Sequence, residues 1–202
     1  WALEEVEGGY ILDCGFWHFF ARDEPGSPHY VLTRVESATR HALELRYDRG
    51  RLVEVIDTAG RVIELRRDGT GLIRTLQCRA PTTGEIQVFG QYEYDAEQRL
   101  VAFTDPDGYV TRFEYVGTAH LSKIEYPTGL TVHYRYDRQW RCIESWCDYG
   151  ERPDPALADD LPEYLPGGVT RARGAHHILV EFGEDGYSEV TDSVRTQRYF
   201  AN

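Results

Sequence analysis

Apolar and polar side chains alternate with a period of two over several short stretches of this 202-residue chain. After Gly108, Tyr, Thr, Phe and Tyr occupy every second position of 109–115, and Val, Arg and Glu lie between them. After Gly129, Leu, Val, Tyr and Tyr alternate with Thr, His and Arg over 130–136. Such alternation is typical of a β-strand with one covered face. We therefore expect a strand after each of these two glycines.

Turn-forming residues separate the predicted strands. Asp105-Pro106-Asp107-Gly108 predicts a tight turn, because proline fixes φ and glycine tolerates positive φ. The segments ending in Gly60 and Gly129 have the same character. A second strand is expected after each turn at the other end, beginning at the pairs Leu52/Val55, Leu100/Phe103 and Leu121/Ile124. Each unit is then a β-hairpin, and hairpins must stack because a lone hairpin is marginally stable in water.

A tyrosine recurs at the end of the first predicted strand, followed by Asp at 47–48, 94–95 and 136–137 and by Val at 115–116. Tyr94, Tyr115 and Tyr136 are each 21 residues apart, and such internal repetition decides the architecture. The Asp is expected to accept hydrogen bonds from backbone N–H groups in its own turn. The predicted repeat signature, to which we assign a structural role, comprises Tyr47, Asp48, Gly60, Tyr94, Asp95, Gly108, Tyr115, Gly129, Tyr136 and Asp137.

Degenerate copies extend the pattern in both directions. Arg67-Asp68 carries Arg in place of Tyr, and Arg40 takes the position that glycine occupies in other turns. Late strands are expected around Ile178–Phe182 and from Tyr187 onward. We expect one domain of tandem repeats over 1–202, with the clearest repeats at 30–147, degenerate repeats at 1–29 and 169–202, and an acidic, proline-rich insertion at 151–168. A short helical turn near 155–161 is expected in the insertion.

Composition supports strands and excludes some partners. The 14 Tyr, 8 Phe and 4 Trp favour a pleated surface. A net charge of −12 argues against nucleic-acid binding, which needs a surplus of Lys and Arg, and suits solubility or a basic partner. No apolar run is long enough to span a membrane, so no direct membrane contact is expected. The chain has no Met and opens at Trp1, which leads us to expect a piece of a longer polypeptide.

Candidate chemistry is sparse. Cys14, Cys78, Cys142 and Cys147 form no CxxC pair, and we expect buried reduced thiols, with Cys142 in a position that other repeats give to Leu. His176 and His177 are expected to point to opposite faces, so that they cannot share one metal. The carboxylate pairs at 4–5, 159–160 and 184–185 are expected at the solvated surface, and Asp154, Asp159 and Asp160 lack the spacing of a calcium loop.

No catalytic motif is present, so the sequence predicts no catalytic residue, no cofactor and no metal, and hence no enzyme. A glycosidase would need two carboxylates that meet in a cleft. The tyrosine stripe admits two interpretations. It is either packing of hairpin on hairpin, with hydroxyls at the rim, or the lining of a cavity that holds a guest or stacks on sugars.

The repeat resembles the RHS/YD-repeat family, whose unit is Gly, a spacer, Tyr-x-Tyr-Asp-x-x-Gly-Arg-Leu and a turn such as Asp-Pro-x-Gly. The resemblance rests on 47–52, 93–100, 105–108 and 134–137. It implies an all-β fold of tandem hairpins, with a period of 21 residues, that forms part of a spiralling β-sheet ribbon or cocoon. Family members often cleave themselves at a motif of the form Asp-Pro-x-Gly-Leu with a downstream Asn-x-Tyr-x-Tyr stretch. That motif is absent from this sequence, because Tyr109 follows Asp105-Pro106-Asp107-Gly108 within an ordinary repeat.

The resemblance also implies a function. In bacterial members the shell encloses a variable C-terminal toxin until delivery, and many are exported by type VI secretion in interbacterial competition. The implied partners are the C-terminal toxin domain and the remaining shell of the same polypeptide, with a secretion spike protein, a chaperone and an immunity protein bound elsewhere. The implied location is secreted. The alternative is a carbohydrate-binding YD-repeat protein at the cell surface.

Overall fold

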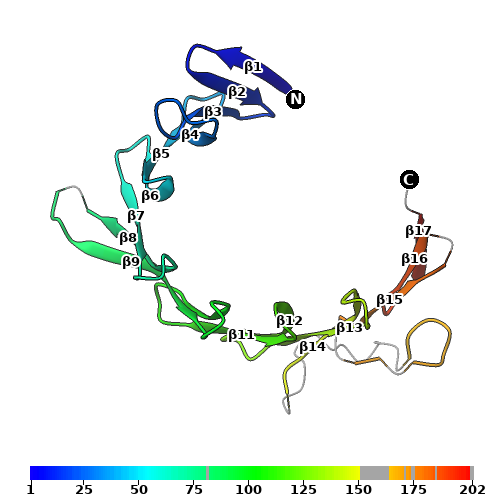
Figure 1. Ribbon diagram of the computed structural model, residues 1–202. Coiled ribbons are helices and arrows are strands. Elements are labelled where there is room, and N and C mark those ends of the chain that lie inside the picture. Colours follow the sequence, from blue (N-terminus) through cyan, green and yellow to red (C-terminus); the bar gives the residue numbers. More distant parts are fainter. Residues whose placement is uncertain (81, 151–163, 171, 174–175, 185, 201–202) are drawn as a thin grey trace. The chain divides into compact units, whose positions relative to one another are not determined.

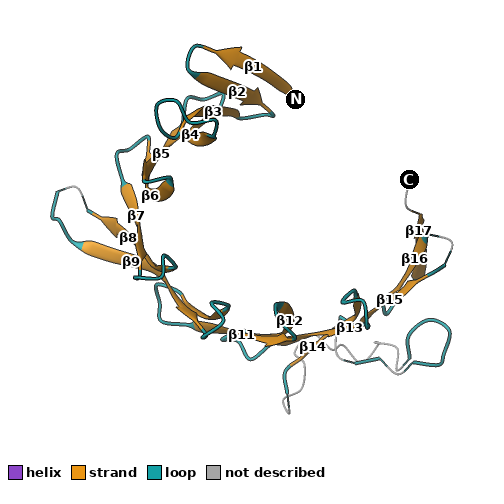
Figure 2. Cartoon of the chain, viewed as in Figure 1, coloured by secondary structure: helices purple, strands orange, loops and turns teal. Residues whose placement is uncertain are grey.

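The computed structural model describes residues 1–80, 82–150, 164–170, 172–173, 176–184 and 186–200. Every helix or strand in this part of the chain is a β-strand, as Figure 2 shows, and the prediction of an all-β fold of tandem hairpins is confirmed. The described residues contain no helix long and apolar enough to cross a membrane. The strands divide between two compact units, and each unit is described by itself.

Unit 1 consists of Trp1–Glu93 and Thr104–Gly108. Within it, each strand pairs antiparallel with the next one along the chain, so that the sequence order is also the order in space. Figure 1 labels its strands, which are β1 (Ala2–Val6), β2 (Gly9–Asp13), β3 (Trp17–Arg22), β4 (Tyr30–Glu36), β5 (Ala42–Asp48), β6 (Arg51–Asp57), β7 (Val62–Arg67), β8 (Ile73–Arg79) and all but the last residue of β9 (Ile86–Tyr94).

Unit 2 consists of Tyr94–Phe103 and Tyr109–Asn202. From β11 onward its strands again pair antiparallel with their neighbours in sequence. They are β10 (Leu100–Thr104, except its last residue), β11 (Val110–Val116), β12 (His120–Glu125), β13 (Thr131–Tyr136), β14 (Cys142–Asp148), β15 (Ile178–Phe182), β16 (Tyr187–Thr191) and β17 (Thr196–Phe200). The strands predicted after Gly108 and Gly129 and the two late strands are thus confirmed.

The connection between β14 and β15 contains the predicted insertion at 151–168. The expected helical turn near 155–161 lies outside the described residues. Just after it, the Leu165 N–H donates to the Thr170 carbonyl at 2.9 Å, and Leu165 is only 2% exposed. This hydrogen bond and the buried Leu165 side chain stabilise a turn that lies between β14 and β15 in sequence.

The strand register gives the sheet of each unit two chemically different faces. In unit 2, Phe113 lies opposite Ile124 on one face, whereas Glu114 lies opposite Lys123 on the other. In unit 1, Leu45 opposite Val55 and Arg46 opposite Glu54 repeat this arrangement. The period of two therefore separates an apolar, tyrosine-bearing face from a face of ion pairs.

Few described side chains are completely buried. The apolar ones less than a tenth exposed are Ala102, Cys147 and Leu165, and the polar ones are Glu144 and His177. Most apolar side chains are half-buried, as expected where a sheet face is not covered by a second layer. Stability must then depend strongly on how each hairpin is fastened to the next.

A β-bulge recurs at the same place in five of the described strand pairs. One strand carries an extra residue just opposite the signature tyrosine or its equivalent, at Thr33, Val53, Arg74, Ser122 and Ile143. Bulges increase the local twist of a strand pair and redirect side chains. The recurrence of the bulge at the same place makes it part of the repeat.

Candidate functional site

Three of the signature tyrosines tie their hairpin to the preceding one. Within a hairpin, β13 and β14 pair from Thr131↔Asp148 to Tyr136↔Cys142. Between hairpins, the pairing of β12 with β13 ends at Lys123↔His133. Beyond that point the Tyr136 hydroxyl donates a hydrogen bond of 2.7 Å to the Leu121 carbonyl. The tyrosine thus bridges the strands where their backbone ladder has ended.

The same bond recurs in both units. The Tyr47 hydroxyl donates to the Leu32 carbonyl at 2.9 Å, and the Tyr115 hydroxyl donates to the Leu100 carbonyl at 2.8 Å. In all three cases the acceptor precedes the tyrosine by 15 residues. We call this bond the tyrosine staple. Each staple satisfies a carbonyl oxygen that would otherwise lack a ladder partner.

Arg67 makes the equivalent bond where the repeat lacks tyrosine. Its Nη2 donates to the Leu52 carbonyl at 3.2 Å, again 15 residues earlier, and its Nη1 donates to the Gly71 carbonyl at 3.0 Å. The predicted correspondence between Arg67 and the signature tyrosines therefore has a structural basis. A long side chain with a terminal donor is what this position requires.

The Asp residues of the signature organise their turns. Asp137 Oδ1 accepts from the backbone N–H groups of Gln139 and Arg141, and its Oδ2 accepts from Arg141 Nε at 2.7 Å. Asp95 makes the same three bonds to its own turn. The Arg141 N–H group and guanidinium hold the pKa of Asp137 below its usual value. The predicted capping of these turns is confirmed for Asp95 and Asp137.

Asp48 does not follow this pattern, and the prediction is wrong there. Its backbone pairs with Arg51 in the β5–β6 ladder, which leaves only Arg49 and Gly50 in the turn. Both have positive φ, of 49° and 72°, as in the tight hairpin turns whose twist matches that of the strands. A turn of two residues does not supply the N–H groups that Asp95 and Asp137 bind.

One position in the four-residue turns always has a left-handed backbone. Gly60, Gly108 and Gly129 hold it with φ of 77°, 85° and 88°. Arg40, Gln98 and Trp140 hold the same position with φ of 62°, 64° and 62°. The prediction that Arg40 replaces a glycine is confirmed. These three non-glycine residues carry a steric cost that glycine avoids.

We expect Gln98→Gly to raise the free energy of unfolding by about 0.5–1 kcal/mol, because glycine adopts this backbone without a Cβ clash. Urea denaturation of the 202-residue chain measures the change. Gly108→Ala is the matched control: its added Cβ would meet no atom within 4 Å, so backbone strain alone should lower stability by a similar amount. Equal stability of the wild-type, Gln98→Gly and Gly108→Ala chains would contradict the assignment of both residues to the strained, left-handed position of the turn.

Burial raises the pKa of Tyr47, Tyr115 and Tyr136 above the usual value. The folded chain therefore holds these phenol protons more tightly than the unfolded chain, in which tyrosine titrates near pH ~10. The stabilisation is complete below that pH and is lost as the pH rises through the folded pKa. We expect the urea midpoint to fall above pH ~10, and to fall less after Tyr→Phe substitution at all three positions. A midpoint that falls equally in both chains would contradict this.

Neighbouring turns also contact one another in unit 2. Arg99 Nη1 donates to the carbonyls of Gly117 and Thr118 at 3.3 and 3.4 Å. The Trp140 indole stacks on His120 with ring centroids 4.4 Å apart, and a Cβ at Gly117 would lie 2.5 Å from the indole. These contacts fasten adjacent hairpins at their turns as well as through the staples.

A buried polar cluster, which the sequence analysis did not predict, lies on the charged face of unit 2. Glu144 on β14 is 3% exposed and binds Arg135 Nε of β13 through Oε2 at 2.5 Å. His177 is 1% exposed, and its Nε2 lies 2.8 Å from Glu144 Oε1. Burial alone would raise the pKa of Glu144, but Arg135 and His177 outweigh it and hold that pKa below its usual value. His176 is exposed, so the predicted opposite orientation of the two histidines is confirmed.

Nothing in the local sequence indicated this cluster. Glu144 has the spacing of a charged residue on the solvated face, like Glu54 and Lys123. Its burial results from Arg173 and His177, which return after the long connection between β14 and β15. The alternation of apolar and polar residues does not predict such contacts between distant parts of the chain.

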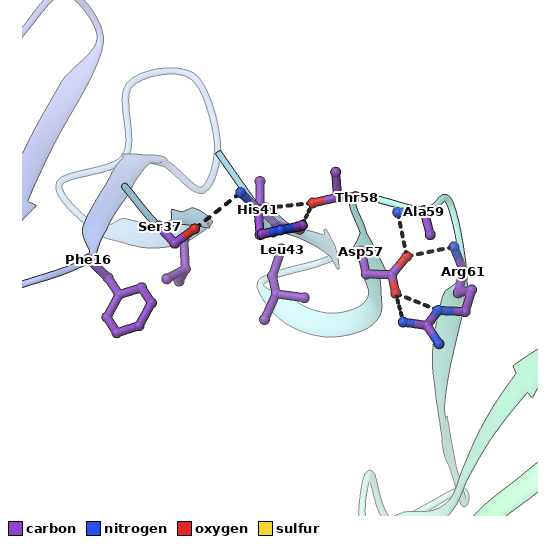
Figure 3. Close-up of a pocket in the computed structure, with 10 residues that line it drawn as sticks. Phe16, Ser37, His41, Leu43, Asp57, Thr58, Ala59 and Arg61 are labelled. Atoms are coloured by element: carbon purple, nitrogen blue, oxygen red, sulfur yellow. Dashed lines mark hydrogen bonds and ion pairs between the residues drawn. The ribbon is translucent and has the colours of Figure 1, made fainter. Parts of the chain in front are cut away.

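An open pocket of about 640 Å³ lies in unit 1, beside the turns at 37–41 and 57–61 (Figure 3). Phe16, Val35 and Leu43 contribute apolar walls. The polar groups are engaged locally: Ser37 Oγ accepts from the His41 N–H, and Asp57 binds both the N–H and the guanidinium of Arg61. The pocket therefore offers an apolar surface and no pair of unengaged carboxylates.

The cysteines only partly match expectation. All four are free thiols, but only Cys147 is buried, whereas Cys14, Cys78 and Cys142 are partly exposed. The prediction of buried thiols is wrong for those three, because the apolar sheet face carries no second layer. Cys142 does lie opposite Tyr136, as Leu121 lies opposite Tyr115, which confirms its place in the repeat.

The structure does not bring the other candidate residues together. Among the described residues, no group of three His, Cys, Asp or Glu side chains is placed to hold a metal ion. Asp154, Asp159, Asp160 and Asp185 lie outside the described residues. Tyr94 is the last residue of β9, Tyr115 lies near the end of β11, and Tyr136 is the last residue of β13. Each of these signature tyrosines therefore marks the start of a turn, and none contributes to a shared centre.

Comparisons with known proteins agree with this arrangement. Residues 94–121 match the model of the RHS repeat. Double-stranded DNA deaminase toxin A of Burkholderia cenocepacia (strain H111) is 33% identical over 99 residues, which is 49% of this chain and 6% of the relative. The crystal structure of TcdB2-TccC3 without its hypervariable C-terminal region superposes with a TM-score of 0.50 at 12% identity, over 95% of this chain and 12% of that one.

The predicted resemblance to RHS/YD-repeat proteins is thus confirmed, most directly at 94–121. That match includes Tyr94, Asp95 and Tyr115. The likeness to the TcdB2-TccC3 structure shows the fold alone. Because the chain spans only a small part of both proteins, their activities and partners are not transferred to it by these matches.

Proposed function

We propose that this chain is a wall segment of an RHS shell that encloses a C-terminal toxin domain of the same polypeptide before delivery into a target cell. The observation that carries the proposal is the tyrosine staple. It recurs three times in phase with the turns, each time fastening a hairpin to the preceding one, and an extended wall of hairpins requires such fastening.

The mechanism is steric sequestration. Backbone pairing closes the hydrogen bonds along each unit, the staples close the gaps between hairpins, and a guest behind such a wall is kept from substrates outside it. In this role the chain itself is not an enzyme, and catalytic activity belongs to the enclosed domain. The net charge of −12 supports a basic guest, because opposite charge favours retention.

The matched repeat and the toxin relative support this reading. In this proposal the polypeptide is secreted, with type VI secretion as the export route and interbacterial competition as the setting. The spike protein, a chaperone and an immunity protein bind elsewhere on the polypeptide. This segment contacts neither nucleic acid nor membrane directly.

Intact mass of the parent polypeptide tests the proposal. Under native conditions we expect a single assembly that contains the shell and a C-terminal fragment. Under denaturing conditions the fragment separates, because only the enclosing wall held it. A single uncut chain with no retained fragment would favour the alternative below.

The alternative is a surface module that binds carbohydrate through exposed aromatic rings. Phe16 lines the pocket in unit 1 and is 54% exposed, and Trp17 on β3 is 39% exposed; exposed rings of this kind stack on sugars. The half-buried and hydrogen-bonded staple tyrosines count against a tyrosine-lined groove. Binding to a glycan array that is lost in Trp17→Ala would support the alternative. A glycosidase has less support, since the pocket contains a single carboxylate, Asp57, which is paired with Arg61.

A further inference from the structure

The face of ion pairs in unit 1 becomes apolar on β2 and β3. On β4 this face carries Arg34, which lies opposite Glu44 of β5. Across the other edge of β4, Arg34 lies opposite Phe19, and Phe19 in turn lies opposite Ile11. The second face of β2 and β3 is mainly apolar too. Strands that are apolar on both faces are typical of a sheet that is covered on both sides.

A shallow hollow of about 290 Å³ marks this apolar part of the face. Its lining residues all come from β1, β2 and β3, and they are Ala2, Glu4, Ile11, Asp13, Trp17 and Phe19. Ile11 and Phe19 are half-buried, whereas Trp17 is 39% exposed. The indole is therefore the aromatic ring that a ligand in the hollow reaches first.

The two carboxylates of the hollow differ from the others on this face. Glu36 and Glu64 each bind an arginine side chain. Neither Glu4 nor Asp13 pairs with a basic side chain in the part of unit 1 that the structure describes. The one local bond is that of Asp13 Oδ1, which accepts from the Gly15 N–H at 3.2 Å. The hollow therefore keeps two negative charges beside its apolar floor.

The register places the indole next to a carboxylate. Asp13 lies directly opposite Trp17, where Cβ atoms are about 5 Å apart. Glu4 lies opposite Ile11, one step diagonally from Asp13. A guanidinium group suits this arrangement, because its flat face stacks on an aromatic ring while its N–H groups bind carboxylates.

The neighbouring strand shows the same chemistry within the chain. The Arg34 guanidinium carbon lies 5.8 Å from the centre of the Phe19 ring, and its Nη2 donates to Glu36 at 2.6 Å. Arg34 and Glu36 neutralise one another, so this pair leaves the two negative charges of the hollow uncompensated. A neutral sugar would cover both carboxylates without offsetting their charge, which disfavours it relative to a cation.

We propose that this hollow binds an arginine side chain from a segment of a partner protein. The guanidinium stacks on Trp17 and donates to Asp13 and Glu4, and an apolar side chain next to that arginine contacts Ile11 and Phe19. Aromatic rings and arginines of this kind contribute most of the binding energy at protein interfaces. The site does not require that the chain enclose a toxin.

An NMR titration of the 202-residue chain with the blocked peptide Arg-Leu-Arg tests the proposal. The Trp17 indole N–H signal, identified by its absence from Trp17→Phe, should shift saturably. The blocked peptide Lys-Leu-Lys should bind at least about threefold more weakly, because an ammonium group neither stacks flat nor binds in a bidentate manner. Glu4→Gln should weaken binding of the arginine peptide at least about threefold.

Glu5→Gln is the matched control. It removes the same charge from the next residue of β1, which points to the opposite face and lies opposite Tyr10, so binding should stay unchanged. Equal weakening by Glu4→Gln and Glu5→Gln, or equal affinity for the two peptides, would overturn the site. The wild-type chain alone gives a further test: a Trp17 signal that shifts with maltohexaose and not with the arginine peptide, or that shifts with neither, would also overturn it.

Discussion

Glu144→Ala is expected to lower the free energy of unfolding of the 202-residue chain by about 1–3 kcal/mol. The substitution leaves the buried His177 ring without its acceptor, which costs about this much, whereas the Arg135 side chain is 56% exposed and stays hydrated. Urea denaturation followed by far-ultraviolet circular dichroism measures the loss. The largest local effect is expected at the β14–β15 junction, where the cluster lies.

Glu97→Ala is the matched control. The Glu97 side chain is 64% exposed and lies 3.5 Å from Arg99 Nη2, so its removal should change stability by less than about 0.5 kcal/mol. Equal effects of the two substitutions would contradict a stabilising role of Glu144 in the buried polar cluster.

Tyr136→Ala is expected to cost about 2–3 kcal/mol. The change removes the staple to Leu121 and the edge-on contact of the tyrosine ring with His120, whose centroids lie 5.1 Å apart. Tyr136→Phe keeps the ring and loses only the hydrogen bond, which is worth about 1 kcal/mol. The difference between the two variants, measured by urea denaturation, separates packing from the staple.

Tyr199→Ala serves as the control for this pair. Tyr199 lies on β17, is 54% exposed, and its hydroxyl donates to the nearby Gln197 side chain rather than to another hairpin. We expect its removal to cost less than about 0.5 kcal/mol. If Tyr136→Phe left stability unchanged while Tyr136→Ala destabilised the chain, the staple hydrogen bond would have no measurable role.

Periodicity in the sequence predicted most of the strands correctly. Alternation after Gly108 and Gly129 led to β11 and β13, and the turn residues predicted the left-handed positions, including Arg40. These features are local, because a residue's φ and the face to which it points depend on its immediate neighbours. The Tyr-Asp spacing likewise identified Tyr47, Tyr115 and Tyr136, which form staples, and Asp95 and Asp137, which cap their turns.

The features that were missed depend on contacts between distant residues. The acceptor of each staple is a carbonyl 15 residues away, and no side-chain pattern marks a carbonyl. The burial of Glu144 depends on Arg173 and His177, across a long connection. The turn at Asp48 differs because Gly50 follows it closely and permits a two-residue turn, whereas the general Tyr-Asp rule predicted a longer one.

The staple also explains why the repeat tolerates variation elsewhere. Most apolar side chains on the tyrosine face are half-buried, so exchanging one for another costs little. The hydrogen-bond donor at the end of the strand is different, because the ladder between hairpins has already ended there. Arg67 shows that the side chain can change while the donor is kept.

The rate at which protease cleaves the C-terminal region of the parent polypeptide tests the central claim most directly. The same region expressed without the shell is the reference, and a parent carrying both Tyr115→Ala and Tyr136→Ala tests the contribution of this segment. If the segment is part of an enclosing wall, cleavage in the native parent should be at least about tenfold slower than in the reference, and the double substitution should restore part of that rate. Equal rates in the native parent and in the isolated region would contradict encapsulation.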